Sequence, residues 1–349
     1  MKVLGNLDWR HPLVHARVFI AAQTKKALGA AGVWRALSLA ETAVVQTDAV
    51  GVTGDQPPQR RLIYKTPRPE FVDVENLTYT SAGIAIHDGQ YAARYSIRTP
   101  SILQILKKPE SAVSKIIARG TVVECETPYT YGDWVGDYVL SLVTAQNLIE
   151  PLVLPAYLAK KPYVIRDVEA LNIQYIVAEK PVCIETARVL RKRTPSYYWG
   201  PAEVDAYRKH FAITPPQAAS GSITYLARFN TVSETAQRAY PSKEVAQIVT
   251  SLGGEVFDAR QSSPEQFNAI GAKMETVIGD QGSALFGVMH WRTKNVIELT
   301  RRDWWHNANL FIANGSGVEN YAVIAVDGLN EAALRARIEG HLRAFGVTF

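Results

Sequence analysis

Cysteine is scarce in this chain, since only Cys125 and Cys183 occur among its 349 residues. Two thiols so far apart make neither a disulfide framework nor a zinc-binding pattern, and they suit a reducing compartment. Long apolar runs are also missing, because no segment approaches the roughly 20 apolar residues of a membrane span. The segment "VFIAA" near the amino terminus is too short for the apolar core of a signal peptide. These absences predict a cytoplasmic protein.

The chain also carries little excess of positive over negative charge. Lysine and arginine number 38 against 33 acidic residues, and the resulting net charge of +5 is not gathered into long tracts. This composition does not favour binding to nucleic acid. The first 40 residues differ, since they hold six basic residues against one acid, Asp8, and read partly as a helix. Such a helix either packs on the body of the protein or rests on an anionic surface, so peripheral contact with an inner membrane stays open.

The motifs that mark many enzyme sites do not occur here. There is no G-x-G-x-x-G, P-loop, H-E-x-x-H or zinc cluster. His11 and His15 stand one helical turn apart but have no neighbouring acid or cysteine. The acid pairs Asp73–Glu75, Glu124–Glu126 and Asp167–Glu169 resemble a metal-binding D-x-D only distantly. We therefore expect no metal ion.

The carboxyl-terminal part has the more regular pattern. After the Pro-rich segment Ala212–Ser222, short β-rich runs alternate with helical patterns, which is typical of a parallel sheet. The expected strands cover 223–229, 255–260, 276–280, 295–299 and 321–327, and the expected helices cover 242–254, 263–274, 283–291, 304–315 and 330–346. The pattern predicts a Rossmann-like lobe over residues 213–329. The last helix, in 330–349, could pack back on the amino-terminal lobe.

The amino-terminal part is predicted to be a second α/β lobe, over residues 1–212, with a β-rich entry. Expected strands lie in 41–50, 60–65, 82–89, 91–97, 120–126, 151–157 and 174–179, and expected helices cover 131–149 and 164–173. A length of 349 residues with 47% apolar and 20% charged residues suits two such domains. Two lobes would face a cleft between them, and ligands favour the carboxyl ends of parallel strands.

Two carboxylates stand out in the predicted helix "YGDWVGDYVLSLVTAQ". Its apolar residues form one stripe, and Asp133 and Asp137 lie one turn apart on another face. Asp133 could simply cap the start of the helix while Asp137 is a solvated helix acid. Alternatively, one of the two carboxylates points into the cleft and acts as a general base.

The junction "GDQGSALFG" follows the predicted strand 276–280. Small residues between a strand and a helix could form a plain turn. They could also expose backbone N–H groups to a phosphate, with Gly282 allowing close approach and Ser283 donating a hydrogen bond. As a motif the segment is weak, because it matches neither common phosphate-binding pattern.

Three more polar residues and one basic run could contribute to ligand binding. Arg228 follows the first strand of the lobe, where its guanidinium could bind a diphosphate. Glu298 ends the strand 295–299, where a carboxylate could accept hydrogen bonds from ribose or simply face water. Arg238 lies in a loop and could be an ordinary surface residue. The basic run Arg188–Arg193 reads as a solvated face that could also hold an anionic glycan or a lipid headgroup.

The order of these residues resembles glycosyltransferase family 61 over roughly residues 125–330. The pattern of that family has an Arg after the first strand, a second Arg before the next helix, "lG" at the end of that helix, "vvGxHGAgLtN" and then "viEl". These positions fall here on Arg228, Arg238, Leu252-Gly253, Gln266 (a Gln of the following helix), the segment "IGDQGSAL" and Glu298. Gln281 stands where the family has His, and Gly282, Ser283 and Ala284 replace its Gly-Ala-Gly. Asp133 stands at the His of its upstream "HW" helix.

The resemblance implies a two-lobed, inverting glycosyltransferase of the GT-B type without a metal or other cofactor. A nucleotide-sugar donor, most simply of the UDP type, would place its diphosphate near Gln281, Gly282, Ser283 and Ala284. Arg228 and Arg238 would clamp the diphosphate and Glu298 would hold the ribose. Asp133 or Asp137 would take the proton of a glycan or lipid-linked glycan acceptor, in capsule, lipopolysaccharide or exopolysaccharide synthesis. Two alternatives stay open: a non-catalytic glycan- or nucleotide-binding protein, and an NAD-type oxidoreductase, which the missing Gly-rich fingerprint disfavours.

Overall fold

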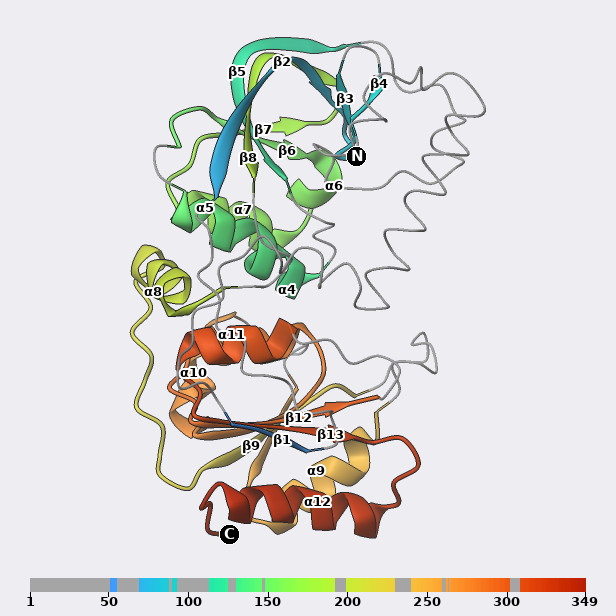
Figure 1. Cartoon of the computed structure of the whole chain (residues 1–349), viewed down its shortest axis with the longest axis vertical. Coiled ribbons are helices and arrows are strands. Elements are labelled where there is room, and N and C mark those ends of the chain that lie inside the picture. Colours follow the sequence, from blue (N-terminus) through green and yellow to red (C-terminus); the bar gives the residue numbers. More distant parts are fainter. Residues whose placement is uncertain are drawn as a thin grey trace. The chain divides into compact units, whose positions relative to one another are not determined.

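The computed structural model of this chain describes residues 51–54, 69–87, 90–92, 113–124, 130–145, 148–191, 199–229, 240–258, 262, 264–301 and 308–349. These residues form two compact units. Unit 1 holds the described residues from 69 to 191, and unit 2 holds residues 51–54 together with those from 199 to 349. Both units combine helices with a sheet that contains parallel strands, so the predicted α/β class is confirmed (Figure 1).

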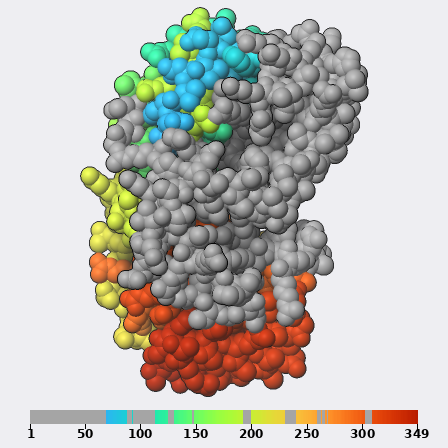
Figure 2. Space-filling model, viewed as in Figure 1, coloured from blue at the N-terminus to red at the C-terminus, as the bar shows by residue number. Residues whose placement is uncertain are grey.

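Unit 1 is built on a seven-stranded mixed sheet with the order β4-β3-β2-β8-β5-β6-β7. Its strands are β2 (Glu70–Tyr79), β3 (Ala85–His87), β4 (Gln90–Tyr91), β5 (Lys115–Glu124), β6 (Leu152–Pro155), β7 (Tyr175–Ala178) and β8 (Val182–Arg191). The last four run parallel to one another, whereas β2 pairs antiparallel with both β8 and β3. The space-filling view shows residues of β2, in blue, at the surface of unit 1 (Figure 2).

The long strands β2 and β8 were not predicted. In β2 the alternation of inward and outward side chains shifts by one residue, and this shift hides the strand in the sequence. In β2 the inward apolar positions are Val72 and Val74 and then Leu77 and Tyr79, so the alternation shifts by one residue at Asn76. Asn76 has a positive φ of 54°, which asparagine tolerates better than most residues. A strand that changes its inward face loses the strict period of two by which strands are recognised.

The helices of unit 1 follow β5 and β6. They are α4 (Tyr131–Asp133), the π-helix η3 (Trp134–Val139), α5 (Leu140–Thr144), α6 (Ala156–Ala159) and α7 (Pro162–Ala170). The first three form one continuous helix that ends at Thr144, five residues before the predicted end. The helices α6 and α7 connect the parallel strands β6 and β7.

Unit 2 is built on a six-stranded sheet with the order β1-β13-β12-β11-β9-β10, in which every pair is parallel. Its strands are β1 (Gly51–Gly54), β9 (Ile223–Ala227), β10 (Glu255–Asp258), β11 (Thr276–Asp280), β12 (Asn295–Thr300) and β13 (Asn320–Ala325). The strands β9 to β13 all match predicted ones. The strand β1 was not predicted to join this sheet, and it pairs with β13 from a distant part of the chain.

Figure 1 shows α11 on one face of this sheet and α9 and α12 on the other. The helices of unit 2 are α8 (Pro201–His210), α9 (Ser242–Ser251), α10 (Pro264–Ala269), the 3-10 helices η6 (Ile270–Lys273) and η7 (Ser283–Met289), α11 (Ala308–Ser316) and α12 (Glu331–Ala344). The core on one face joins the inward residues of the strands to α9 and α12. Leu334, Ile338 and Leu342 of α12 are buried in this core, so the last helix packs on the sheet of its own unit.

The division of the chain differs from the predicted boundary at residues 212 and 213. Besides residues 51–54, unit 2 holds the described residues from 199 onward, so the Pro-rich segment lies inside it. There Ala219 N–H donates to the carbonyl of Ala272 at 2.7 Å. In the described part of the chain, no helix is both long enough and apolar enough to cross a lipid bilayer.

Candidate functional site

A hydrogen-bonded set of polar side chains in unit 2 lies where β9 and β11 end. These parallel strands are neighbours, with Leu226 paired to Gly279 near their carboxyl ends. After β9 the chain passes through α9 to β10 on one side, whereas β11 lies on the other side of β9. Such a reversal of strand order leaves a crevice outside the carboxyl ends of the two strands, and open α/β sheets bind ligands there.

Asp280, the last residue of β11, holds the polar groups at these strand ends together. Its carboxylate accepts hydrogen bonds from the Tyr225 hydroxyl at 2.8 and 2.9 Å, from Arg228 N–H at 3.0 Å and from the Ser242 hydroxyl at 3.1 Å. The side chain is 3% exposed, and burial raises its pKa to about 7 although these hydrogen bonds act in the opposite direction. Burial and the charge of Asp280 also raise the pKa of Tyr225.

Hydrogen bonds to its backbone hold Arg228 in place, and its guanidinium lies near Gly282. Its N–H donates to Asp280, and its carbonyl accepts from the Ser242 hydroxyl at 2.9 Å. A Cβ atom built on Gly282 would lie 3.6 Å from Arg228 Nη1. The structure therefore brings these two predicted site residues together at the carboxyl edge of the sheet.

The segment after β11 differs from the predicted helix over 283–291. It forms the seven-residue 3-10 helix η7, which starts after Gly282 with its φ of 156° and ψ of −174°, a backbone region almost restricted to glycine. The 3-10 helix is wound more tightly than an α-helix, and glycines next to it allow close packing. Leu285 fills the space over Gly279, and the ring of Trp291 fills the space over Gly287. Ser283 and Ala284 are half-buried at the start of this helix. So short a helix aligns few peptide dipoles, and Arg228 is the stronger anion-binding group here.

Gln281 and Glu298 are buried and engaged with neighbours in the same unit. Gln281 is 2% exposed, and its Oε1 accepts from the Thr300 hydroxyl at 2.7 Å. Glu298 is fully buried inside β12 rather than at its end, because the strand continues to Thr300. Its carboxylate accepts from Asn309 Nδ2 at 2.6 Å and from the Tyr321 hydroxyl at 2.9 Å. This bonding ties α11 and β13 to β12.

The predicted base Asp133 caps its helix, but not as the N-cap residue. Thr130 is the N-cap, and its Oγ1 accepts from Asp133 N–H at 3.2 Å. The Asp133 carboxylate accepts in return from Thr130 N–H at 2.9 Å and from the Thr130 hydroxyl at 2.8 Å. This reciprocal pair is a capping box.

The second predicted base, Asp137, lies in the π-helix η3 and is 5% exposed rather than solvated. Segments of π-helix are rare and are frequent at functional sites. In the same helix Trp134 Nε1 donates to the Asp167 carboxylate at 2.9 Å, and Arg166 Nη2 lies 2.6 Å from that carboxylate. Burial raises the pKa of Asp167, and burial followed by the charges of Asp133 and Asp167 raises the pKa of Tyr163 to about 12.

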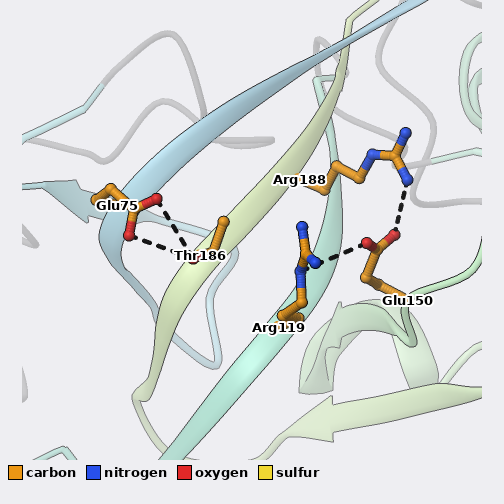
Figure 3. Close-up of polar contacts among 5 residues, drawn as sticks. All are labelled: Glu75, Arg119, Glu150, Thr186 and Arg188. Atoms are coloured by element: carbon orange, nitrogen blue, oxygen red, sulfur yellow. Dashed lines mark hydrogen bonds and ion pairs between the residues drawn. The ribbon is translucent and has the colours of Figure 1, made fainter.

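The predicted basic run begins on the sheet of unit 1, where Arg188 is paired rather than simply solvated. Its Nη1 lies 3.1 Å from Glu150 Oε2, and Arg119 Nε lies 3.6 Å from Glu150 Oε1. The Thr186 hydroxyl donates to Glu75 on the adjacent strand (Figure 3). Residues 192 and 193 of the run lie outside the described residues, as does Arg238.

Sequence reasoning missed the residues that build the crevice. Asp280 ends the predicted strand 276–280, and an acid at the end of a buried strand was the available signal. Tyr225 and Ser242 carried no signal, because each reaches Asp280 only through the fold. Among the residues that the structure describes, no group of three or more His, Cys, Asp or Glu side chains could hold a metal ion.

In comparisons with known proteins, no family model and no curated sequence matches this chain. The resemblance to glycosyltransferase family 61 therefore stays a prediction.

Proposed function

We propose that this protein is an inverting glycosyltransferase that binds a nucleotide-sugar donor at the carboxyl edge of the unit 2 sheet. The observation that carries the proposal is the approach of Arg228 to Gly282 at the crevice between β9 and β11. The order β10-β9-β11-β12-β13 is the 2-1-3-4-5 order of doubly wound nucleotide-binding sheets, whose ligands lie at this point. In this view unit 2 is the Rossmann-like donor lobe of a GT-B-type enzyme.

The diphosphate of the donor would meet Arg228 and the backbone at Gly282. A guanidinium offers two parallel N–H donors to a phosphate, and glycine lets the phosphate oxygens approach the main chain. As the bond between sugar and phosphate breaks, negative charge grows on the leaving diphosphate. A fixed cation at this position stabilises that charge more in the transition state than in the ground state. Asp280 contributes by holding the backbone of Arg228 in place.

The acceptor hydroxyl must lose a proton as it attacks the anomeric carbon. Asp133 and Asp137 are the two candidates for this step, and their surroundings differ. Asp133 already accepts two hydrogen bonds from Thr130, which supports a structural role. Asp137 lies buried in the π-helix segment, which supports Asp137 as the base. The acceptor we propose is a glycan or lipid-linked glycan of bacterial capsule, lipopolysaccharide or exopolysaccharide synthesis.

Ligand-induced thermal stabilisation tests the donor site. We expect one of UDP, GDP, CMP or ADP to raise the melting temperature, since a ligand at about 100 times its Kd adds roughly 2.7 kcal/mol. Arg228→Ala should weaken binding about 10- to 100-fold, as expected for the loss of charge-assisted hydrogen bonds, and Arg228→Lys should lie between. Arg335→Ala on α12 removes a positive charge elsewhere in unit 2 and should leave binding unchanged. Stabilisation by NAD alone would favour an oxidoreductase.

Release of nucleotide from donor sugars in the presence of glycan acceptors tests the transfer. Loss of a general base costs about 10²- to 10⁴-fold in rate, so Asp137→Asn should lose that much while nucleotide affinity stays the same. Asp133→Asn should lose less, because the asparagine oxygen can still cap the helix. If a nucleotide binds but no donor is turned over, the alternative of a non-catalytic nucleotide- or glycan-binding protein replaces the enzyme.

A further inference from the structure

A second cavity lies at the opposite edge of the unit 2 sheet. Its volume is about 410 Å³, and three of its lining residues, Glu275, Lys294 and Glu319, directly precede β11, β12 and β13. It therefore opens at the amino ends of these strands, whereas Arg228 and Asp280 lie at the carboxyl ends. Arg208 of α8 and Gln217 of the Pro-rich segment complete this part of its wall. Nothing in the proposed donor site uses this cavity.

Two guanidinium groups line this cavity, and among the described residues neither donates a hydrogen bond to a carboxylate. Arg208 donates through Nε to the carbonyl of Met289 at 2.8 Å and through Nη2 to the carbonyls of Ser316 at 3.2 Å and Trp291 at 3.5 Å. Its Nη1 forms an ion pair with Asp205 at 3.7 Å, whose side chain is 72% exposed. Arg292 donates through Nη1 to the neutral side-chain oxygen of Gln217 at 3.1 Å. Burial lowers the pKa of Arg208, the charge of Asp205 acts in the opposite direction, and the charge of Arg292 lowers the pKa further. An anion between the two groups would relieve their repulsion.

A buried hydroxyl in the same wall lacks a hydrogen-bond partner. Thr293 is 5% exposed, and within the part of the chain that the structure describes its Oγ1 neither donates nor accepts a hydrogen bond. Leaving such a group unsatisfied is costly, and native proteins rarely do so without a reason. The Thr293 Oγ1 is closed off from solvent, so a ligand oxygen in the cavity satisfies it once the Thr293 side chain turns toward the cavity. Thr293 directly follows Arg292 in the chain, so both could contact one ligand.

The acidic residues of the cavity are already engaged. Glu275 accepts a hydrogen bond from Gly221 N–H, and Glu319 lies 3.9 Å from Lys294 Nζ. Their remaining carboxylate oxygens can accept hydrogen bonds from hydroxyl groups. The wall thus offers cationic donors for one anionic group and acceptors for several hydroxyls. A cavity of about 410 Å³ lies within the size range of small-molecule sites.

We infer that this cavity is a second binding site, for a small hydroxylated anion such as a sugar phosphate or a sugar carboxylate. Arg208 and Arg292 bind the phosphate or carboxylate, and Thr293 donates to it. Glu275 and Glu319 accept hydrogen bonds from the sugar hydroxyls. The site does not depend on the proposed transfer reaction.

Isothermal titration at low ionic strength tests the inference with glucose 6-phosphate, glucuronate, inorganic phosphate and glucose. We expect glucose 6-phosphate or glucuronate to bind more tightly than inorganic phosphate, and glucose not to bind. The two charged sugars distinguish a phosphate from a carboxylate ligand. Arg292→Ala should weaken binding at least tenfold and Thr293→Val severalfold. Neither variant should fail to fold, since Arg292 bonds an exposed amide and valine has nearly the shape of threonine.

Two controls separate this site from the donor site. Arg335→Ala removes an arginine far along the chain on α12 and should leave the affinity unchanged. Arg228→Ala should weaken nucleotide binding about 10- to 100-fold but leave the binding of the charged sugar unchanged. The inference is overturned if no charged sugar binds, if Arg292→Ala binds as well as the wild type, or if Arg228→Ala removes both ligands.

Discussion

Asp280 gives unit 2 a stability that falls as the pH rises from 3.8 to about 7. In the unfolded chain an aspartate releases its proton near pH 3.8, whereas burial raises the pKa of Asp280 to about 7 in the folded protein. Between these pH values the folded state therefore binds more protons than the unfolded state. The free energy of unfolding then decreases with rising pH over this window and is constant above and below it.

The size of the effect follows from the two pKa values. A difference of this kind corresponds to about 1.4 kcal/mol for each tenfold change in proton affinity, so the full window is worth about 4 kcal/mol. Asp280→Asn removes the titration but keeps the shape of the side chain. The asparagine oxygen can accept from Arg228 N–H and from the Ser242 hydroxyl, and its amide can donate to the Tyr225 oxygen. The variant should fold and should be the more stable protein above pH 7.

Urea denaturation of both proteins from pH 5 to pH 8, followed by tryptophan fluorescence, measures this difference. We expect the stability of the wild type relative to Asp280→Asn to fall by roughly 3 kcal/mol over this range. Asp205→Asn is the matched control, because it removes a carboxylate of the same unit whose side chain is 72% exposed. Parallel curves for the wild type and Asp280→Asn would refute the assignment of the pH dependence to Asp280.

Two further substitutions test the hydrogen bonds of other predicted site residues. Thr130→Ala should destabilise unit 1 by about 1 kcal/mol in urea denaturation because it removes the capping box with Asp133, and Thr130→Ser should restore that stability. Tyr321→Phe should lower the stability of unit 2 by about 2 kcal/mol, since it removes a donor from the fully buried Glu298. Tyr175→Phe, which removes a hydroxyl that bonds an exposed partner at 3.4 Å, should change the stability little, and an equal loss in both variants would contradict this reasoning.

Most of unit 2 could be predicted from the sequence because its central strands, β9, β11, β12 and β13, are buried on both faces. Strands β9, β11 and β13 are short apolar runs bounded by breakers, and each is separated from the next by a helix-length segment. The same reasoning could not assign β1 to this sheet. Its partner β13 lies at the other end of the chain, and a local pattern carries no information on such pairing.

The candidate site was predictable in part, for a related reason. Arg228 and Gly282 could be named because each stands at a strand end in the sequence. Glu298 was named as well, but the pattern could not show that Asn309 and Tyr321 already occupy its carboxylate. Side chains at the ends of neighbouring strands are visible in a sequence, whereas their hydrogen-bond partners depend on the packing of other elements.

The negative charge of Asp280 has a consequence for ligand binding that its hydrogen bonds alone do not have. An asparagine could accept from Arg228 N–H without the loss of stability that a buried carboxylate brings at neutral pH. A carboxylate also attracts the guanidinium of Arg228, and this attraction lowers the pKa of Asp280 against the effect of burial. A diphosphate bound to the same guanidinium would compete for that positive charge and would favour the protonated carboxyl group. Binding of an anion in the crevice would then take up a proton near pH 7. The structural carboxylate and the proposed ligand are therefore coupled through Arg228.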